Sequence, residues 1–269
     1  MKFFERFHIP AFGKFGLLDG IVFNNDYKSW HRNRNFVSPA LASPKFLRGF
    51  VISIEKLFRK SEYRWKSIIN DGIELDFSEW MKCFTTDITI SQVTKQPSYS
   101  LASFDINNEI AKSEEVIKSL KFTDAAKSFF SSIPYFLFIP SFMTDYVPGF
   151  ISFRKKCERN INYMNETIFK FIDKRRKELE EGAELDSDLL DHLLMAHTSV
   201  DFSNNETDKV APMTNNEIKA CLWDILLAGV DSTGNSLSFL IYNIAKNPEF
   251  LVNIHKEIKK VFGPGQNIE

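Results

Sequence analysis

One stretch of the chain, residues 214–246, constrains the fold and the function more than any other. It opens with Thr214-x-x-Glu217, the pattern of a capping box, in which each side chain accepts a hydrogen bond from a backbone N–H at the start of a helix. Because the second half is apolar over most of its circumference, we expect a largely buried helix that ends before Pro248. Apolar residues recur in it at helical spacing, at Ile218, Cys221, Leu222, Ile225, Leu226, Leu237, Leu240, Ile241 and Ile244.

The centre of this helix carries residues that a purely structural helix would avoid. The heptapeptide AGVDSTG combines two glycines, a carboxylate and two hydroxyls, each of which lowers stability inside a buried helix. Ala228 and Gly229 leave room for a flat or bulky ligand to lie against the backbone. Asp231 beside Ser232 and Thr233 is a carboxylate–hydroxyl group that can carry protons from solvent into a dry pocket. A kinked helix whose polar groups are satisfied by neighbours, without a ligand, explains the same residues equally well.

This heptapeptide resembles a known signature. AGVDST is similar to the central-helix motif of the cytochrome P-450 monooxygenases, Ala/Gly-Gly-x-Asp/Glu-Thr-Thr/Ser, and the Asn-Pro-Glu that ends the helix leads into another helix, as in that family. The resemblance implies that Asp231, Ser232 and Thr233 act in catalysis and that Ala228 and Gly229 contact the haem. Ser232 departs from the motif, since the family usually has threonine there. A serine can donate the same proton, but it lacks the methyl group that restricts a threonine rotamer.

A second resemblance lies near the N-terminus. We expect a helix near residues 26–36, in which Trp30-x-x-x-Arg34 places an indole N–H and a guanidinium on one face, where they can hold an anion. For an isolated pair, a surface tryptophan covered by an arginine is the alternative. The pair is similar to the WxxxR helix of the cytochrome P-450 family. That resemblance implies that Trp30 and Arg34 bind a haem propionate.

Composition excludes several other classes of protein. The 269 residues are enough for a substantial core, and the 27 phenylalanines favour a packed interior over disorder. The formal net charge of -1 gives no global attraction to nucleic acid. The three cysteines are widely separated and suit a reducing compartment without disulfides, and neither they nor the five histidines have metal-site spacing. We find no signal peptide and no membrane-spanning run.

Two further segments suggest contacts with partners. We expect residues 45–70 to form a long helix with a basic face. This face is either a solvated surface or a docking surface for an acidic electron-transfer partner. Residues 129–150 are rich in aromatic side chains and interrupted by three prolines, so they are too broken for a membrane-spanning helix. The family resemblance implies lid helices and a connecting loop near residues 105–182, so this stretch is expected to contact the membrane surface. A buried irregular loop is the other interpretation.

Two motifs of the family do not occur in the sequence. There is no Glu-x-x-Arg and no Phe-x-x-Gly-x-Arg-x-Cys-x-Gly loop, and none of the three cysteines has such surroundings. The loop supplies the axial cysteine whose sulfur donates electron density to the haem iron. We therefore interpret the chain as an internal fragment of a cytochrome P-450, expected to be inactive as given.

The sequence as a whole predicts a mainly α fold, the helical part of a cytochrome P-450 truncated at both ends, in a single incomplete domain over residues 1–269. The function implied by the resemblance is a haem-dependent monooxygenase that inserts one oxygen atom of O2 into a small hydrophobic substrate. Its electrons would come from NADPH through a reductase, and a complete member of the family would lie at the cytosolic face of the endoplasmic reticulum membrane. The alternatives are a truncated, non-catalytic helical paralogue, a membrane-surface interaction protein, and a helical interaction module that matches both motifs by chance.

Overall fold

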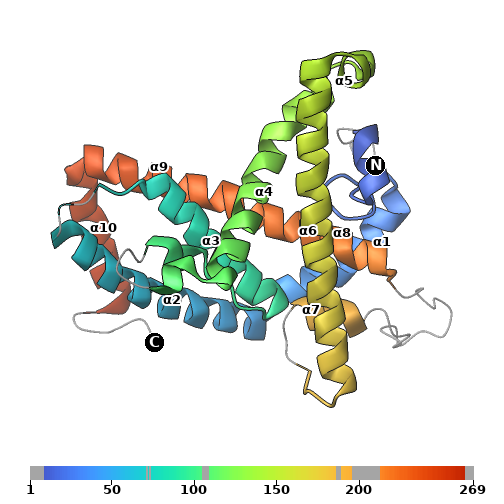
Figure 1. The fold of residues 1–269 in the computed structure, drawn as a ribbon. Coiled ribbons are helices and arrows are strands. Elements are labelled where there is room, and N and C mark those ends of the chain that lie inside the picture. Colours follow the sequence, from blue (N-terminus) through green and yellow to red (C-terminus); the bar gives the residue numbers. More distant parts are fainter. Residues whose placement is uncertain are drawn as a thin grey trace.

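The structure is a computed structural model, which describes residues 9–70, 72, 74–104, 109–185, 189–195 and 213–263. Within these ranges the chain forms helices joined by short connections, and no strand occurs (Figure 1). The predicted mainly α architecture is therefore confirmed for the part of the chain that is described. The start of the predicted lid region, residues 105–108, lies outside the described residues.

The helices include three short 3-10 helices (η1 to η3) and one π turn (η4). In chain order they are η1 Pro10–Phe15, α1 Tyr27–Leu41, α2 Pro44–Asn70, α3 Phe77–Thr94, η2 Ser100–Phe104, η3 Glu109–Lys112, α4 Glu114–Phe138, α5 Ser141–Tyr146, α6 Pro148–Glu180, α7 Leu189–Met195, α8 Asn215–Leu227, η4 Ala228–Ser232, α9 Thr233–Lys246 and α10 Pro248–Phe262. The first predicted helix, near residues 26–36, is α1, which extends to Leu41.

Side chains that the sequence places at helix starts satisfy the free backbone N–H groups there. Asp26 accepts hydrogen bonds from the N–H groups of the second and third residues after it, and so begins α1. Thr214 and Glu217 form the predicted capping box, in which the Thr214 N–H donates to Glu217 Oε2 at 2.7 Å and the Glu217 N–H donates to Thr214 Oγ1 at 3.3 Å. These caps fix where the first helix and the central helix begin.

The main core forms where α4, α6, α7 and α8 meet. Its centre is the edge-to-face pair of Phe129 and Trp223, whose ring centroids lie 4.4 Å apart. One apolar stripe of α6 faces this core, at Cys157, Ile161, Met164, Ile168 and Ile172. A second cluster surrounds Trp80 of α3, which stacks on Phe84 and packs against Trp65 of α2. Helix α3 therefore lies between two apolar clusters.

Buried polar side chains of α8 bind the N-terminal segment. Asp224 accepts hydrogen bonds from the N–H groups of Ile21 at 2.6 Å and Val22 at 2.8 Å. The ammonium of Lys219 donates to the carbonyl of Phe15 at 2.7 Å, and its burial lowers the pKa of Lys219, against the attraction of Asp19. These bonds hold the N-terminal segment against the first half of the central helix, and an ion pair between Arg32 and Glu217 connects α1 to it.

Helices α4 and α6 lie side by side, and α5 caps the far end of the pair (Figure 1). The stretch 129–150 was expected to be irregular, but it is helical: α4 continues through Pro134 to Phe138, and Pro148 begins α6. Proline at 134 removes a single N–H from the helix, and packing of the neighbouring aromatic rings compensates for it. Among the described helices, none combines the length and the apolar character that crossing a bilayer requires.

The second half of the central helix differs from its prediction. It was expected to be largely buried, yet in α9 only Gly234 is buried, and Phe239 and Tyr242 are 68% and 58% exposed. Helix α10 has no buried residue. The described helices that contact α9 cover the side that carries Gly234, and this leaves the opposite apolar side in solvent. Apolar periodicity predicted the helix correctly but did not predict what covers it.

Candidate functional site

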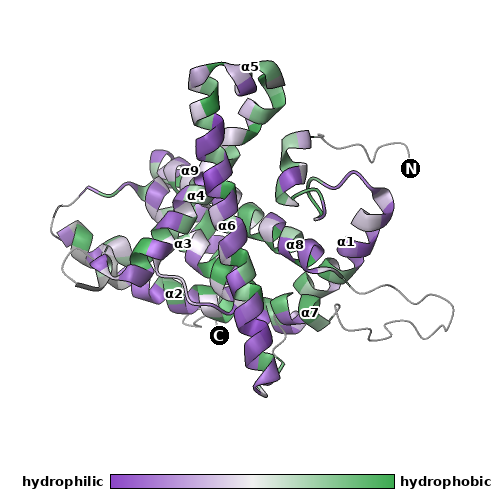
Figure 2. Cartoon of the chain, turned by 45° about the vertical axis from the view of Figure 1, so that its right-hand side comes forward, coloured by the Kyte–Doolittle hydropathy of each residue, from purple (hydrophilic) through white to green (hydrophobic). Residues whose placement is uncertain are grey.

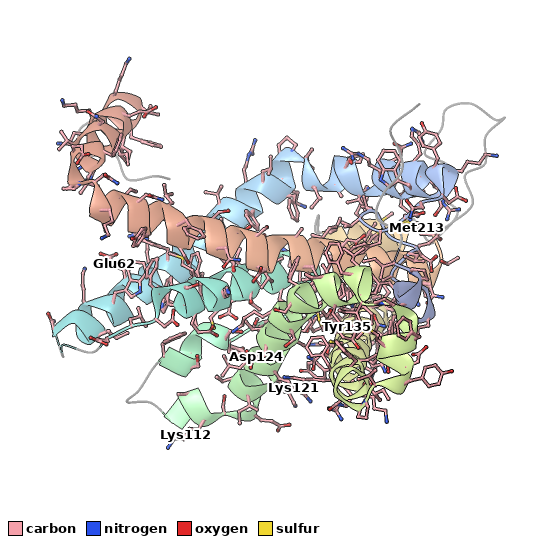
Figure 3. The ribbon with its side chains drawn as sticks, turned by 90° about the horizontal axis from the view of Figure 1, so that it is seen from above. Glu62, Lys112, Lys121, Asp124, Tyr135 and Met213 are labelled. Atoms are coloured by element: carbon pink, nitrogen blue, oxygen red, sulfur yellow. The ribbon has the colours of Figure 1, made fainter. Side chains whose placement is uncertain are left out.

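The central helix is a single rod that changes its winding once, in the middle. Helices α8 and α9 run continuously through the π turn Ala228–Ser232 (Figure 3). A π turn replaces the usual i→i+4 hydrogen bonds by i→i+5 bonds and is often found at functional sites. The turn coincides with the heptapeptide that the sequence singled out. Both interpretations of that heptapeptide, kinked helix and ligand site, predict a local distortion at this position.

Helix α3 packs against the π turn through threonine side chains. The hydroxyl of Thr85 donates across the interface to the carbonyl of Val230 at 2.9 Å. Gly229 lies against Thr89, because a Cβ at position 229 would be only 2.7 Å from both Thr89 Oγ1 and Thr89 Cγ2. Gly229 therefore faces α3 and permits close helix packing. Its predicted contact with haem stays a prediction.

The carboxylate of the heptapeptide is held by two neighbours. Asp231 Oδ1 lies 3.7 Å from the ammonium of Lys82 on α3, and Asp231 Oδ2 accepts a hydrogen bond from the Asn235 amide at 3.1 Å. Both members of the ion pair have side chains 20% exposed, so the pair is partly screened by solvent. Asp231 is thus placed between the helix interface and the exposed side of the turn.

The remaining predicted residues of the heptapeptide lie on its exposed side. Ala228, Ser232 and Thr233 are all exposed, and the Ser232 hydroxyl donates to the carbonyl of Ala228 one turn earlier. That bond is the back-bonding of a helical serine that accompanies bent helices. The structure thus brings Ser232 and Ala228 together and places Asp231 between them and α3.

Trp30 and Arg34 form a stacked pair on α1. The guanidinium carbon of Arg34 lies 5.3 Å from the centre of the Trp30 ring, within the range of a cation–π contact. Arg34 is exposed and Trp30 is half-buried. The stack is the arrangement of a surface tryptophan covered by an arginine, and it also leaves a cation free to meet an anionic group. The predicted propionate contact stays a prediction.

None of the three cysteines has the chemistry of an axial thiolate ligand. All three are buried, and burial is the main cause that raises the pKa of each thiol, to about 12 for Cys83. A haem-binding cysteine acts as a thiolate, which a raised pKa disfavours. The three buried cysteines therefore do not fit the role of a thiolate ligand to haem iron. Among the described residues, no three His, Cys, Asp or Glu side chains gather as a metal site.

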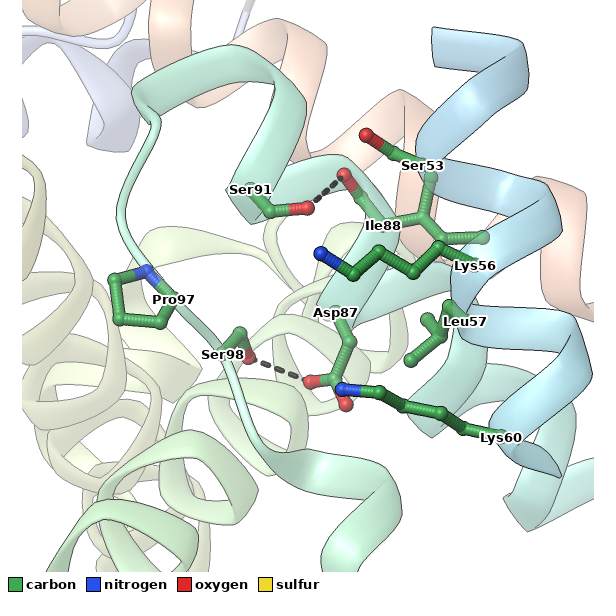
Figure 4. Close-up of a pocket in the computed structure, with 9 residues that line it drawn as sticks. All are labelled: Ser53, Lys56, Leu57, Lys60, Asp87, Ile88, Ser91, Pro97 and Ser98. Carbon is green, nitrogen blue, oxygen red and sulfur yellow. Dashed lines mark hydrogen bonds between the residues drawn. The ribbon is translucent and has the colours of Figure 1, made fainter. Parts of the chain in front are cut away.

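Sequence reasoning missed the polar side of α3. Asp87 is buried and accepts hydrogen bonds from Ser98 Oγ at 2.6 Å, the Ser100 N–H at 2.7 Å and the Leu101 N–H at 2.9 Å, which fixes the start of η2. Burial raises the pKa of Asp87, against these three donors. A pocket of about 180 Å³ lies above it, between α3 and the basic face of α2, where Lys56 reaches over it (Figure 4).

The missed residues that touch the candidate site are Lys82, Thr85 and Thr89. Thr85 and Thr89 are four residues apart, so both hydroxyls lie on the side of α3 that faces the central helix. Their four-residue spacing indicates that the two threonines share one side of a helix, but the sequence does not say which helix this side contacts.

Comparisons with known proteins show the family of the chain. The family model described as Cytochrome P450 matches residues 1–269. Among curated relatives, 11-oxo-beta-amyrin 30-oxidase of Glycyrrhiza uralensis is 27% identical over 87% of this chain and 41% of its own length. Human aromatase is 24% identical over 91% of this chain and 42% of its own length. This chain therefore spans less than half the length of those two relatives.

A solved structure shows the same fold. The crystal structure of the cytochrome P450DA heme domain superposes with a TM-score of 0.68 and 18% sequence identity, covering 98% of this chain and 50% of that one. At this identity the similarity establishes the fold, while the family model establishes the family. The family model over residues 1–269 and the matching helical fold lead to one conclusion: the chain belongs to the cytochrome P450 family.

Proposed function

We propose that this chain forms part of a haem-dependent monooxygenase, which inserts one oxygen atom of O2 into a small hydrophobic substrate. The observation that carries the proposal is the placement of Asp231 and Ser232 on a π turn of the central helix, in a chain whose whole length matches the cytochrome P450 family. Electrons would come from NADPH through a reductase, for which the basic face of α2 is a candidate docking surface.

The residues present fit one side of a haem group. Arg34 and Trp30 would hold a propionate, and Ala228, on the exposed side of the turn, would contact the haem, whereas the space beside Gly229 is filled by Thr89. The haem would supply the iron at which O2 is activated. The axial sulfur would come from outside the three cysteines of this chain, so the proposal requires the other half of a haem domain.

The polar groups of the turn would transfer the protons that the reaction consumes. Insertion of one oxygen atom consumes two electrons and two protons and releases one water for each substrate hydroxylated. Asp231 lies between the Lys82 ammonium and the exposed side of the turn, so its carboxylate can exchange protons with solvent and pass them inward. The hydroxyls of Ser232 and Thr233, next in sequence, can receive such a proton or hold a water molecule that does.

A carbon monoxide difference spectrum tests the proposal. The chain alone, reduced in the presence of haem and carbon monoxide, should not give the spectrum of thiolate-ligated haem. The same chain joined to the C-terminal half of a cytochrome P450 haem domain should give it, with one haem per polypeptide. Stoichiometric haem with that spectrum in the chain alone would contradict the assignment of the three buried cysteines. A joined protein that folds but never binds haem would refute the proposed function and favour a non-catalytic paralogue.

Contact with a membrane surface is a second proposed property, and the exposed tip of the α4–α6 pair supports it. Three aromatic side chains there are largely exposed, at Phe138, Phe142 and Tyr146, with exposed fractions of 77%, 63% and 81%. Hydrophobic and hydrophilic residues alternate along the ribbon at this tip, around α5 (Figure 2). Exposed aromatic residues in a cluster are typical of interfacial membrane contacts. For a complete protein, the cytosolic face of the endoplasmic reticulum membrane is the proposed location.

A further inference from the structure

The hydroxyl of Thr85 has three carbonyl acceptors within reach. It lies 2.9 Å from the carbonyl oxygen of Val230, 3.0 Å from that of Met81 and 3.1 Å from that of Lys82. A hydroxyl has one proton to donate, so only one of these bonds forms fully at a time. Two acceptors belong to α3 itself and the third belongs to the central helix. Thr85 is buried, with 4% of its surface exposed, so solvent does not compete for the proton.

The carbonyl of Val230 has the capacity for this bond because of the π turn. In a regular α-helix it would accept from the N–H of Gly234, four residues later. Here the N–H of Thr233, three residues later, donates to it at the end of the turn. A carbonyl oxygen has two lone pairs, and the Thr85 hydroxyl occupies the remaining one. The bond from α3 is therefore made to the segment whose winding is irregular.

Two glycines of the central helix make close contacts with α3, and both contacts depend on how the helix is wound between them. Gly229 lies against Thr89, while a Cβ at Gly234 would lie 3.2 Å from both Thr85 Oγ1 and Lys82 Cγ. Glycines five residues apart would point to different sides of a regular α-helix, on which residues three and four apart are neighbours. A π turn, with its i→i+5 bonds, brings residues five apart into line. The π turn therefore helps to place both glycines against α3.

We propose that Thr85 is a positioning residue of the candidate site. Its hydroxyl, by donating to the Val230 carbonyl, holds the π turn and thereby fixes the direction of the two residues that follow, Asp231 and Ser232. The catalytic meaning of this role rests on the proposed function. The role itself is independent of the Lys82–Asp231 ion pair, which restrains only the end of one side chain.

Amide hydrogen exchange of this chain, without haem, tests the role directly. Thr85→Val keeps the shape of the side chain and removes the proton. We expect it to speed exchange of the amides of residues 233–236 by roughly 3- to 10-fold, the effect of losing one hydrogen bond. Thr85→Ser retains the donor and should restore wild-type exchange. Thr86→Val is the matched control, because Thr86 is also buried in α3 but donates to the Lys82 carbonyl of its own helix.

The outcomes separate the positioning role from general packing. Faster exchange in Thr85→Val alone, reversed in Thr85→Ser, supports the role; equal exchange in Thr85→Val and wild type, or an equal increase in Thr86→Val, overturns it. If Thr85→Val does not fold, Thr85→Cys, a weaker donor in a similar volume, is measured instead and judged by the same ordering.

A second readout uses the chain joined to the rest of a haem domain. There Thr85→Val should raise the share of electrons released as hydrogen peroxide while KM for the substrate stays within twofold, and Thr85→Ser should reverse the change. If Thr85→Val changes amide exchange but not the share of electrons released as peroxide, Thr85 holds the π turn but the geometry of the turn does not direct protons. A wild-type joined protein without monooxygenase activity would refute the proposed function, whereas the exchange result would still decide the role of Thr85.

Discussion

Gly229 of the π turn and Thr89 of α3 are in direct contact, and the contact leaves no room for a side chain at position 229. A Cβ there would lie 2.7 Å from both Thr89 Oγ1 and Thr89 Cγ2. Real Cβ atoms do not approach other atoms this closely, so with any larger residue the Thr89 side chain or the helices must shift. The close approach of the two backbones at Gly229 also lets the Thr85 hydroxyl reach the Val230 carbonyl.

The first prediction is that Gly229→Ala destabilises the protein only while Thr89 is present. Overpacking costs about 1–3 kcal/mol, which exceeds the roughly 1 kcal/mol that alanine gains over glycine in a helix. In a Thr89→Ala background the obstructing atoms are gone, so Gly229→Ala should become neutral or stabilising. Urea unfolding of the four proteins measures the coupling between the two sites. Additive effects of the two substitutions would contradict the contact.

The buried ion pair of Arg175 and Asp191 should be essential for joining α6 to α7. Arg175 Nε and Nη2 each donate to a different carboxylate oxygen of Asp191 at 2.6 Å, and Asp191 is 1% exposed. Removing one partner leaves a buried charge, so Arg175→Met should lower the free energy of unfolding by about 3–5 kcal/mol. Lys66→Met, which breaks an exposed pair with Glu62, should cost less than about 0.5 kcal/mol. Similar losses for both variants would show that burial does not matter here.

Mild acid should destabilise the fold partly through His192 of α7. Burial lowers the pKa of His192 below its usual 6.5, against an opposing backbone hydrogen bond at Phe36. The unfolded chain then binds a proton more readily than the folded one, so this contribution to stability is present above pH 6.5 and is lost as the pH falls through the folded-state pKa. His192→Gln should flatten the decline of Tm between about pH 7 and pH 5. His255→Gln, in the exposed helix α10, is the control and should leave the slope unchanged.

The tip of the α4–α6 pair should bind lipid through its exposed rings. Replacing Phe138, Phe142 and Tyr146 with serine should weaken partition of the protein into phospholipid vesicles, because burying one such side chain is worth on the order of 1.5–3 kcal/mol. Phe136 belongs to the core side, since its ring lies 5.6 Å from that of Phe12, and it should be left unchanged.

A matched control replaces three exposed apolar residues at the opposite end of the molecule, in α9 and α10, with serine. The residues are Phe239, Tyr242 and Val261. If these changes weaken partition as much as those at the tip, the binding is a general property of exposed apolar surface and the tip has no special role.

Local signals in the sequence predict the helices well and their surroundings poorly. Thr214 with Glu217 predicts the start of the central helix correctly, since a capping box depends only on residues within one turn. The burial of α9 was wrongly predicted, because burial depends on which distant segments pack against a helix. Pro134 shows a related limit: it is a helix breaker locally, yet α4 continues through it because core packing of its neighbours outweighs one lost hydrogen bond.

The candidate site was predicted in part for the same reason. AGVDST predicts a distortion of the central helix, and the π turn lies there. The role of Thr85 could not be read from the sequence, because its bond to Val230 joins residues 145 positions apart. Gly229 was interpreted as space for a ligand, whereas the structure places it against Thr89. A glycine alone does not reveal whether a ligand or another helix occupies the space beside it.

The final prediction assigns proton delivery to the hydroxyl of Ser232, in the chain joined to the rest of a haem domain. Hydroxylation of one substrate molecule consumes O2, two electrons and two protons, and the same electrons and protons instead yield hydrogen peroxide when a proton reaches the wrong oxygen atom. Ser232→Val removes the hydroxyl and adds one heavy atom on the exposed side of the turn, so it should keep haem and substrate binding but shift electrons from product to peroxide. Asp231→Asn blocks the carboxylate that exchanges protons with solvent, so it should slow turnover by on the order of 100-fold.

Thr233 is the competing hydroxyl, because it is also exposed and lies about 100° further around the helix. Ser236→Val, an exposed serine of α9 outside the turn, is the control for placing a β-branched residue in this helix and should stay coupled. The measurement is the ratio of product to peroxide per NADPH consumed. Full coupling in Ser232→Val with uncoupling in Thr233→Val would assign the role to Thr233. If Ser232→Val, Thr233→Val and the double variant all stay coupled, the hydroxyls of the turn have no part in proton delivery, and the turn serves only the packing of the central helix against α3.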